Sequence, residues 1–107
     1  MSLPVFLTAR AQRDVDDAYD WWARHRSAEQ ARRWRDECVQ AVDSLAEKHL
    51  LCGLAPERGE FAFDMRQLNF GLSRRPTHRV VFTVRPEMIL VLRVQHLAQR
   101  RLSPDDI

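Results

Sequence analysis

The chain has 107 residues, of which 45% are hydrophobic and 30% charged, and its formal net charge is +2. This length accommodates one domain, residues 1–107, with a core large enough to fold without disulfides or a structural metal. The composition excludes a disordered protein, and no apolar run approaches the ~20 residues of a membrane-spanning helix. The amino terminus lacks the features of a signal peptide, which predicts a cytoplasmic protein with no membrane partner.

The first half of the chain begins with a short alternating segment at residues 3–8, which predicts a strand, and Pro4 places it at a strand start or an edge. Thr8 is typical of a helix N-cap, and the helix is predicted to extend to about His25. Its apolar face comprises Ala11, Val15, Ala18, Tyr19 and Trp22. Four aspartates lie mostly off this face and are predicted to be solvated: Asp14, Asp16, Asp17 and Asp20.

A second helix is predicted after the sequence Ser-Ala-Glu-Gln at 27–30, which is typical of a capping box. Its apolar residues repeat every three or four positions: Ala31, Trp34, Cys38, Ala41, Val42 and Leu45. Because the two stripes match and the connection is short, the helices are predicted to form an antiparallel hairpin. Trp21 lies beside the first stripe, where an exposed tryptophan would suit a contact with a partner or a second copy.

After a loop at about 51–60, the apolar period changes to two. Three strands are predicted, at about 63–70, 79–85 and 88–96, and the last two are joined by a hairpin turn. The faces predicted to pack on the helices comprise Val80, Phe82 and Val84 in one strand and Leu90, Leu92, Val94 and His96 in the next. Residues 100–107 are predicted to form either a short tail or a helical turn after Ser103.

These elements define the predicted fold class. It is α+β, a single domain in which one strand and a helical hairpin precede a three-stranded antiparallel sheet. The hairpin is predicted to pack on one face of that sheet. The two cysteines, Cys38 and Cys52, lack the spacing of a zinc site and are predicted to be free thiols. No motif indicates a metal or another cofactor.

Charge is distributed unevenly along the chain. Sixteen of the 17 basic residues are arginine. Residues 65–104 contain eight arginines and one acid, Glu87, a net +7, which fits an anionic partner such as a nucleic acid or an acidic protein segment. Alternatively, these charges deter aggregation at a sheet edge. The segment 69–78 is predicted to be a loop with Arg74 and Arg75 at an exposed tip, suited to a phosphate or carboxylate contact.

The order of elements, and above all the sequence HRVVFTV followed by ILVLRVQH, resembles the toxins of the RelE/ParE superfamily of bacterial type II toxin–antitoxin modules. The matching positions are Arg79, Val80, Val81, Phe82, Val84 and His96, with Arg66, Gln67 and Leu68 in the preceding strand. The resemblance implies a small toxin that is neutralised by an acidic antitoxin wrapped around its sheet and helices. It also implies a homodimer or a hetero-oligomer with that antitoxin.

Two mechanisms occur in the superfamily, and the resemblance implies one or the other. RelE-like toxins cleave messenger RNA on the ribosome, for which Arg66, Arg79 and Arg93 would supply cations and His96 or His78 would transfer protons. ParE-like toxins act on DNA gyrase. The only tyrosine, Tyr19, lies in the first helix, and Leu97 stands where some nucleases have tyrosine, so the ParE-like action on gyrase is favoured.

The remaining hypotheses concern activity and contacts. A third hypothesis is a degenerate, non-toxic binding module of the same fold. The catalytic set would be Arg66, Arg79 and His96 if the chain is a nuclease. The residues predicted to contact the target or the antitoxin are Arg74, Arg75, His78, Arg85 and Arg93. As alternatives without a functional role, His78 would be exposed in the loop and His96 would be half-buried at a strand end.

Overall fold

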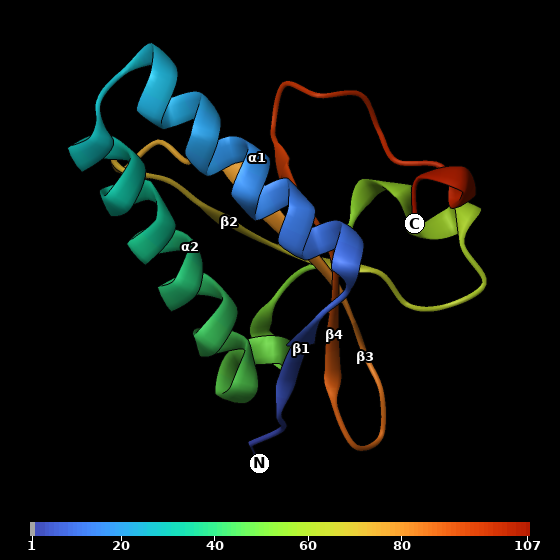
Figure 1. The fold of residues 1–107 in the computed structure, drawn as a ribbon. Coiled ribbons are helices and arrows are strands. Elements are labelled where there is room, and N and C mark those ends of the chain that lie inside the picture. The colour runs from blue at the N-terminus through green and yellow to red at the C-terminus, as the bar shows by residue number, and fades with distance from the viewer. Residues whose placement is uncertain (1) are drawn as a thin grey trace.

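The computed structural model describes residues 2–107, and its elements follow the predicted order (Figure 1). The main elements are β1 (Val5–Leu7), α1 (Ala9–His25), α2 (Ala28–Lys48), β2 (Arg66–Phe70), β3 (His78–Val84) and β4 (Ile89–His96). Three short 3-10 helices lie between or after them: η1 (His49–Leu51), η2 (Pro56–Glu60) and η3 (Pro104–Asp106). No helix among residues 2–107 combines the length and apolar character that a membrane crossing requires.

The four strands form one sheet in the order β1-β4-β3-β2. The last three strands pair antiparallel, as predicted, whereas β1 pairs parallel with β4 and places Val5 opposite Ile89. The predicted three-stranded sheet therefore gains the amino-terminal strand as a fourth, edge strand. Pro4 suits this place because it has no N–H to donate, and its carbonyl accepts from the N–H of Ile89 at 2.9 Å.

The helices α1 and α2 form the predicted antiparallel hairpin on one face of the sheet (Figure 1). Both predicted N-caps are present. The Thr8 hydroxyl accepts from the N–H of Ala11, and the Ser27 hydroxyl accepts from the N–H of Gln30. The apolar stripes of the helices meet the sheet in the main core, whose largest fully buried side chain is Trp34. The α+β class and the position of the hairpin are thus confirmed.

A second, smaller core lies on the opposite face of the sheet. Val81 and Leu92 pack there with Met65 and with Leu102 of the carboxyl-terminal segment. Val81 points away from the helices because it alternates with Val80 and Phe82, which belong to the main core. The chain covers this face with the segment between α2 and β2 and with its own tail. The prediction described only one packed face of the sheet.

An irregularity in the sheet corrects the predicted facing of β4. Val81 pairs with Arg93 and Phe82 pairs with Val91, so Leu92 has no partner of its own on β3. Such a β-bulge reverses the alternation of side chains on the bulged strand. Leu90 and Leu92 therefore pack with the second core, and only part of the predicted face, including Val94, joins the main core.

The start of β2 differs from the prediction. β2 begins at Arg66 rather than near residue 63, because Phe61 and Phe63 leave the sheet and pack against the second core.

In the loop between β2 and β3, Gly71 lies against the backbone, and a Cβ atom there would come within 3.0 Å of the Thr77 nitrogen. The loop can close so tightly only with glycine at that position.

The carboxyl-terminal segment forms the helical turn that was one of the two predicted alternatives. It is η3, which begins after Ser103 with a capping box to Asp106. Just before it, the buried side chain of Leu102 fixes the segment to the second core.

Candidate functional site

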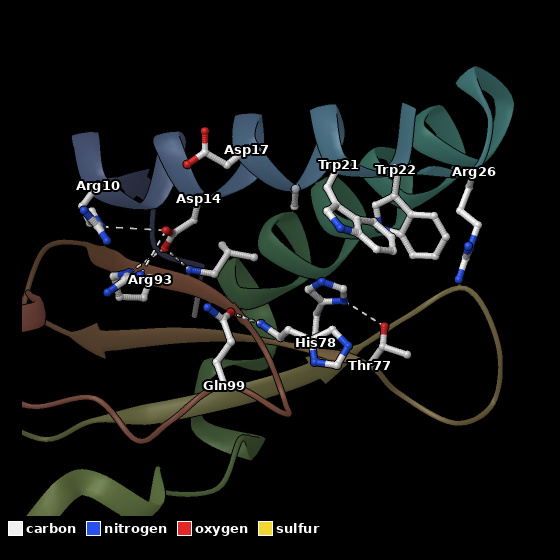
Figure 2. A pocket seen from close by; sticks show the side chains of 13 residues that line it. Arg10, Asp14, Asp17, Trp21, Trp22, Arg26, Thr77, His78, Arg93 and Gln99 are labelled. Carbon is white, nitrogen blue, oxygen red and sulfur yellow. Dashed lines mark hydrogen bonds and ion pairs between the residues drawn. The ribbon is translucent and has the colours of Figure 1, made fainter. Parts of the chain in front are cut away.

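A hollow of about 560 Å³ lies between α1 and the part of the sheet where β3 begins and β4 ends (Figure 2). Trp21 and Trp22 of α1 form one wall, and their rings extend from the helix towards the strand that carries His78, as Figure 2 shows. Arg10 and Arg26 lie at opposite ends of the helical wall. Trp21 is 47% exposed, so this hollow presents a large aromatic side chain to incoming molecules.

A mostly buried ion pair joins α1 to the sheet. Arg93 on β4 donates to both carboxylate oxygens of Asp14, from Nε at 2.7 Å and from Nη2 at 3.2 Å. The N–H of Val94 also donates to Asp14, at 3.0 Å. This corrects the prediction that Asp14 is solvated, and it leaves Arg93 with little freedom to bind another anion. The helical spacing could not reveal the pair, because the partner is 79 residues away.

His78 occupies the inner end of the hollow. Its Nδ1 accepts from the indole N–H of Trp34 at 3.2 Å and lies 2.8 Å from the Thr77 hydroxyl. Because an indole nitrogen can only donate, the proton of the neutral imidazole resides on Nε2. Burial, with a smaller contribution from His96, lowers the pKa of His78 to about 4. His78 is therefore neutral at pH 7, and it is buried in β3 rather than exposed in the loop.

His96 lies beside His78 and is exposed. The two ring centroids are 4.9 Å apart, with the planes nearly perpendicular. The N–H of Ala98 donates to His96 Nδ1 at 2.9 Å, which fixes the ring at the end of β4. The alternative of a half-buried histidine is therefore wrong. The structure brings these two candidate residues together in one hollow.

Arg79, the residue at the centre of the family-like motif, lies elsewhere. Its guanidinium is 8% exposed and forms a bidentate ion pair with Glu57, whose side chain is fully buried. It also donates to the side-chain oxygens of Gln67 at 2.8 Å and Gln95 at 2.7 Å. The hydrogen bond from Arg79 is the largest effect that holds the pKa of Glu57 near 2, and the N–H of Leu102 donates to the same carboxylate.

Glu57 was missed by the sequence reasoning. A signal was present, because an arginine inside an apolar strand must be accompanied by an acid if it is buried. The surrounding segment contains several acids, however, and nothing in the spacing distinguishes Glu57 from its neighbour Glu60, which is exposed.

The other predicted residues are distributed over the surface. Arg66 on β2 is half-buried and donates to the carbonyl of Cys52 at 2.8 Å. Arg74 and Arg75 are exposed at the tip of the β2–β3 loop, and Arg85 is exposed in the turn before β4. Arg66, Arg79 and His96, the proposed nuclease set, therefore do not present three free groups to a common substrate.

The hollow is suited to binding. It combines tryptophan walls, a neutral imidazole and an arginine towards each end, which favours a ligand chain with both apolar and acidic side chains. Asp17 also lines the hollow, and Arg10 is already paired with Asp14 at 3.8 Å, so the end near Arg26 is the better suited to an acidic group. Among residues 2–107, no three His, Cys, Asp or Glu side chains come together in a way that would hold a metal ion. Cys38 and Cys52 are free and buried, and burial raises the pKa of Cys38 to about 12.

The chain is similar to a known protein family and to solved structures. Residues 5–101 match the family model described as the ParE toxin of the type II toxin–antitoxin system parDE. No curated protein matches the chain. A solved structure of the chromosomal ParDE toxin–antitoxin system from P. aeruginosa is similar in fold, with a TM-score of 0.71 and 22% identity, covering 89% of this chain and 96% of that one. The YoeB dimer from Staphylococcus aureus aligns with a TM-score of 0.48 and 15% identity, covering 90% and 98%.

Proposed function

This chain belongs to the ParE toxin family of type II toxin–antitoxin systems, and from that premise we propose that it inhibits bacterial growth by acting on DNA gyrase. The observation that carries the proposal is the family match, which extends over residues 5–101 and so includes every helix and strand except the last 3-10 turn. We further propose that an acidic antitoxin neutralises the toxin.

The state of the arginines supports gyrase over messenger RNA as the target. Cleavage of RNA requires cations that are free to stabilise a charged phosphate in the transition state. Arg79 is instead bound to Glu57 and Arg93 to Asp14, both with side chains 8% exposed. Releasing Arg79 would leave the buried carboxylate of Glu57 without a countercharge, which costs about 3–5 kcal/mol.

One observation favours the nuclease as a second candidate. His78 and His96 lie side by side in the hollow, and imidazole is the side chain that enzymes use most often for proton transfer. The nuclease would require RNA to enter beside α1 and to use cations such as Arg10 or Arg26. His96→Ala would abolish such cleavage while leaving any action on gyrase intact.

The hollow also provides a place for the antitoxin. An antitoxin segment with apolar and acidic residues would place the apolar ones against Trp21 and Trp22 and the acidic ones near Arg10 and Arg26. Such a contact would use both the helical hairpin and the sheet, as expected of a partner that wraps the toxin.

The experiment is induction of the chain in bacteria, with three readouts. We expect slowed growth, an SOS response, and messages that remain uncleaved when mapped by primer extension. Codon-phased cleavage without an SOS response would replace gyrase by the ribosome as the target. Normal growth at confirmed expression would leave the non-toxic binding module. Co-expression of the acidic protein from a neighbouring reading frame is expected to restore growth.

A further inference from the structure

Six exposed arginines gather at one end of the molecule. Four lie around the turn between α1 and α2, and two lie at the tip of the β2–β3 loop: Arg24, Arg26, Arg32, Arg33, Arg74 and Arg75. In the two segments that carry them, residues 24–34 and 69–78, there is one acid, Glu29. We call these six arginines the basic end.

The two segments are held together although 34 residues, 35–68, separate them along the chain. Trp34 of α2 donates to His78 at the base of the loop and packs against Phe70 at its other side, with tilted rings whose centroids are 5.8 Å apart. Arg26 and Thr77 line the same hollow. In Figure 1 the loop that follows β2 lies beside the turn between the helices, and in Figure 2 Arg26 extends towards this loop.

The arginines of the basic end make few contacts within the chain; one of them, Arg26, lies over the Trp21 ring, 5.5 Å from its centroid. Elsewhere, Arg79, Arg93 and Arg100 are each bound by a carboxylate. Within residues 2–107, none of the six has a carboxylate within 4.0 Å, and the one hydrogen bond that any of them donates is from Arg26 to the adjacent carbonyl of His25. Their guanidinium groups are therefore available to an incoming anion.

We propose that the basic end binds the phosphate backbone of duplex DNA. This inference rests on the proposed function, since gyrase holds duplex DNA and a toxin that acts on it approaches that DNA. Arginine side chains on a projecting loop and an exposed helical turn can reach phosphates along a groove edge, and such contacts position a protein without reading sequence. The loop tip, Ser-Arg-Arg-Pro at 73–76, offers no apolar side chain besides the proline to a peptide partner.

The test is a salt titration with the purified chain and a short fluorescein-labelled duplex of mixed sequence, read by anisotropy. Each phosphate contact contributes about −0.9 to the slope of log K against log salt concentration. If four of the six arginines reach phosphates at once, the expected slope is about −3.6. The affinity should then fall about 10²-fold between about 50 and about 200 mM salt.

The variant Arg74→Ala/Arg75→Ala should flatten this slope by about 2 and weaken binding at low salt. The matched control is Arg13→Ala/Arg58→Ala, which removes the same charge from exposed arginines away from this end. Arg13 precedes Arg26 by 13 residues along α1 and its cap, about 20 Å at 1.5 Å per residue. The control should retain most of the slope. Equal losses in both variants would show a general charge effect and overturn the proposal.

Two further outcomes keep this proposal separate from the gyrase proposal. If a glutamate-rich peptide binds and loses affinity in Arg74→Ala/Arg75→Ala while the duplex does not bind, the surface belongs to a protein partner and the DNA proposal is wrong. If the duplex binds as expected but the induced chain produces no SOS response, the gyrase proposal fails while the DNA contact stands.

Discussion

The ion pair between Arg79 and Glu57 joins β3 to the segment that covers the second core. With Glu57 fully buried, replacing it by glutamine leaves a buried guanidinium without a countercharge. We expect Glu57→Gln to lower the free energy of unfolding by about 3–5 kcal/mol, measured by urea denaturation. Glu60→Gln, an exposed acid in the same 3-10 turn, is the control and should change little. Equal stability of the two variants would show that the pair is dispensable.

His78 makes the stability of the fold depend on pH. Its pKa is lowered to about 4 in the folded protein from an ordinary value of 6.5, so between these pH values only the unfolded chain binds the proton. Stability should therefore fall as the pH decreases from about 6.5 to about 4, by up to about 3 kcal/mol. Urea titrations across this range measure the slope.

The control for this slope is His78→Asn, which retains a side-chain acceptor near the Trp34 indole but cannot be protonated. Its stability should be nearly independent of pH in this window, although lower overall. Glu57 does not account for this slope. Its lowered pKa makes the free energy of unfolding depend on pH only below its ordinary value of 4.5. A slope in the asparagine variant as steep as in the parent would assign the titration to another group.

At the scale of elements, the β2–β3 loop depends on one close approach. A methyl group at Gly71 would lie 3.0 Å from the backbone nitrogen of Thr77, which cannot move without breaking its hydrogen bond to the Phe70 carbonyl. We expect Gly71→Ala to destabilise the protein by about 1–3 kcal/mol in thermal unfolding. Gly59→Ala meets nothing within 4 Å and should leave stability unchanged or slightly raised. If Gly71→Ala were as stable as Gly59→Ala or more stable, the β2–β3 loop would have to relax freely around the added methyl group.

The helices and strands differ in how far their sequence predicts them. Thr8 and Ser27 cap the helices by local hydrogen bonds, and the apolar stripes repeat at a helical period, so both helices could be located from neighbouring residues alone. Neighbouring residues alone could not predict which side chains of β4 face the helices, because the bulge at Leu92 depends on how β4 pairs with β3. The second core likewise unites Met65, Val81 and Leu102, whose association only the tertiary fold determines.

At the scale of the whole molecule, the distribution of charge differs from the distribution along the sequence. Residues 65–104 carry a net +7, yet Asp14, Glu57 and Asp106, all outside that range, bind three of its arginines. A count by segment cannot anticipate acids supplied from elsewhere in the chain. Six exposed arginines without a carboxylate partner lie instead at the basic end, where the helical turn meets the loop.

The exposed wall of the hollow provides a test of the antitoxin contact. We expect Trp21→Ala to weaken binding of the acidic antitoxin more than about tenfold, because large aromatic anchors dominate such interfaces. Val39→Ala is the matched control, since Val39 on α2 is 47% exposed, as is Trp21. Calorimetry with the purified antitoxin measures both affinities. Unchanged binding in the tryptophan variant would place the contact elsewhere.

The pairing of β1 with β4 also has a temporal consequence. Val5 to Leu7 are synthesised more than 80 residues before their partners, Ile89 to Val91, and the N–H of Thr8 likewise donates to the distant carbonyl of Val91. Contacts so distant in sequence form late and slow the completion of folding. The four-stranded sheet can therefore close only after Val91 has left the ribosome.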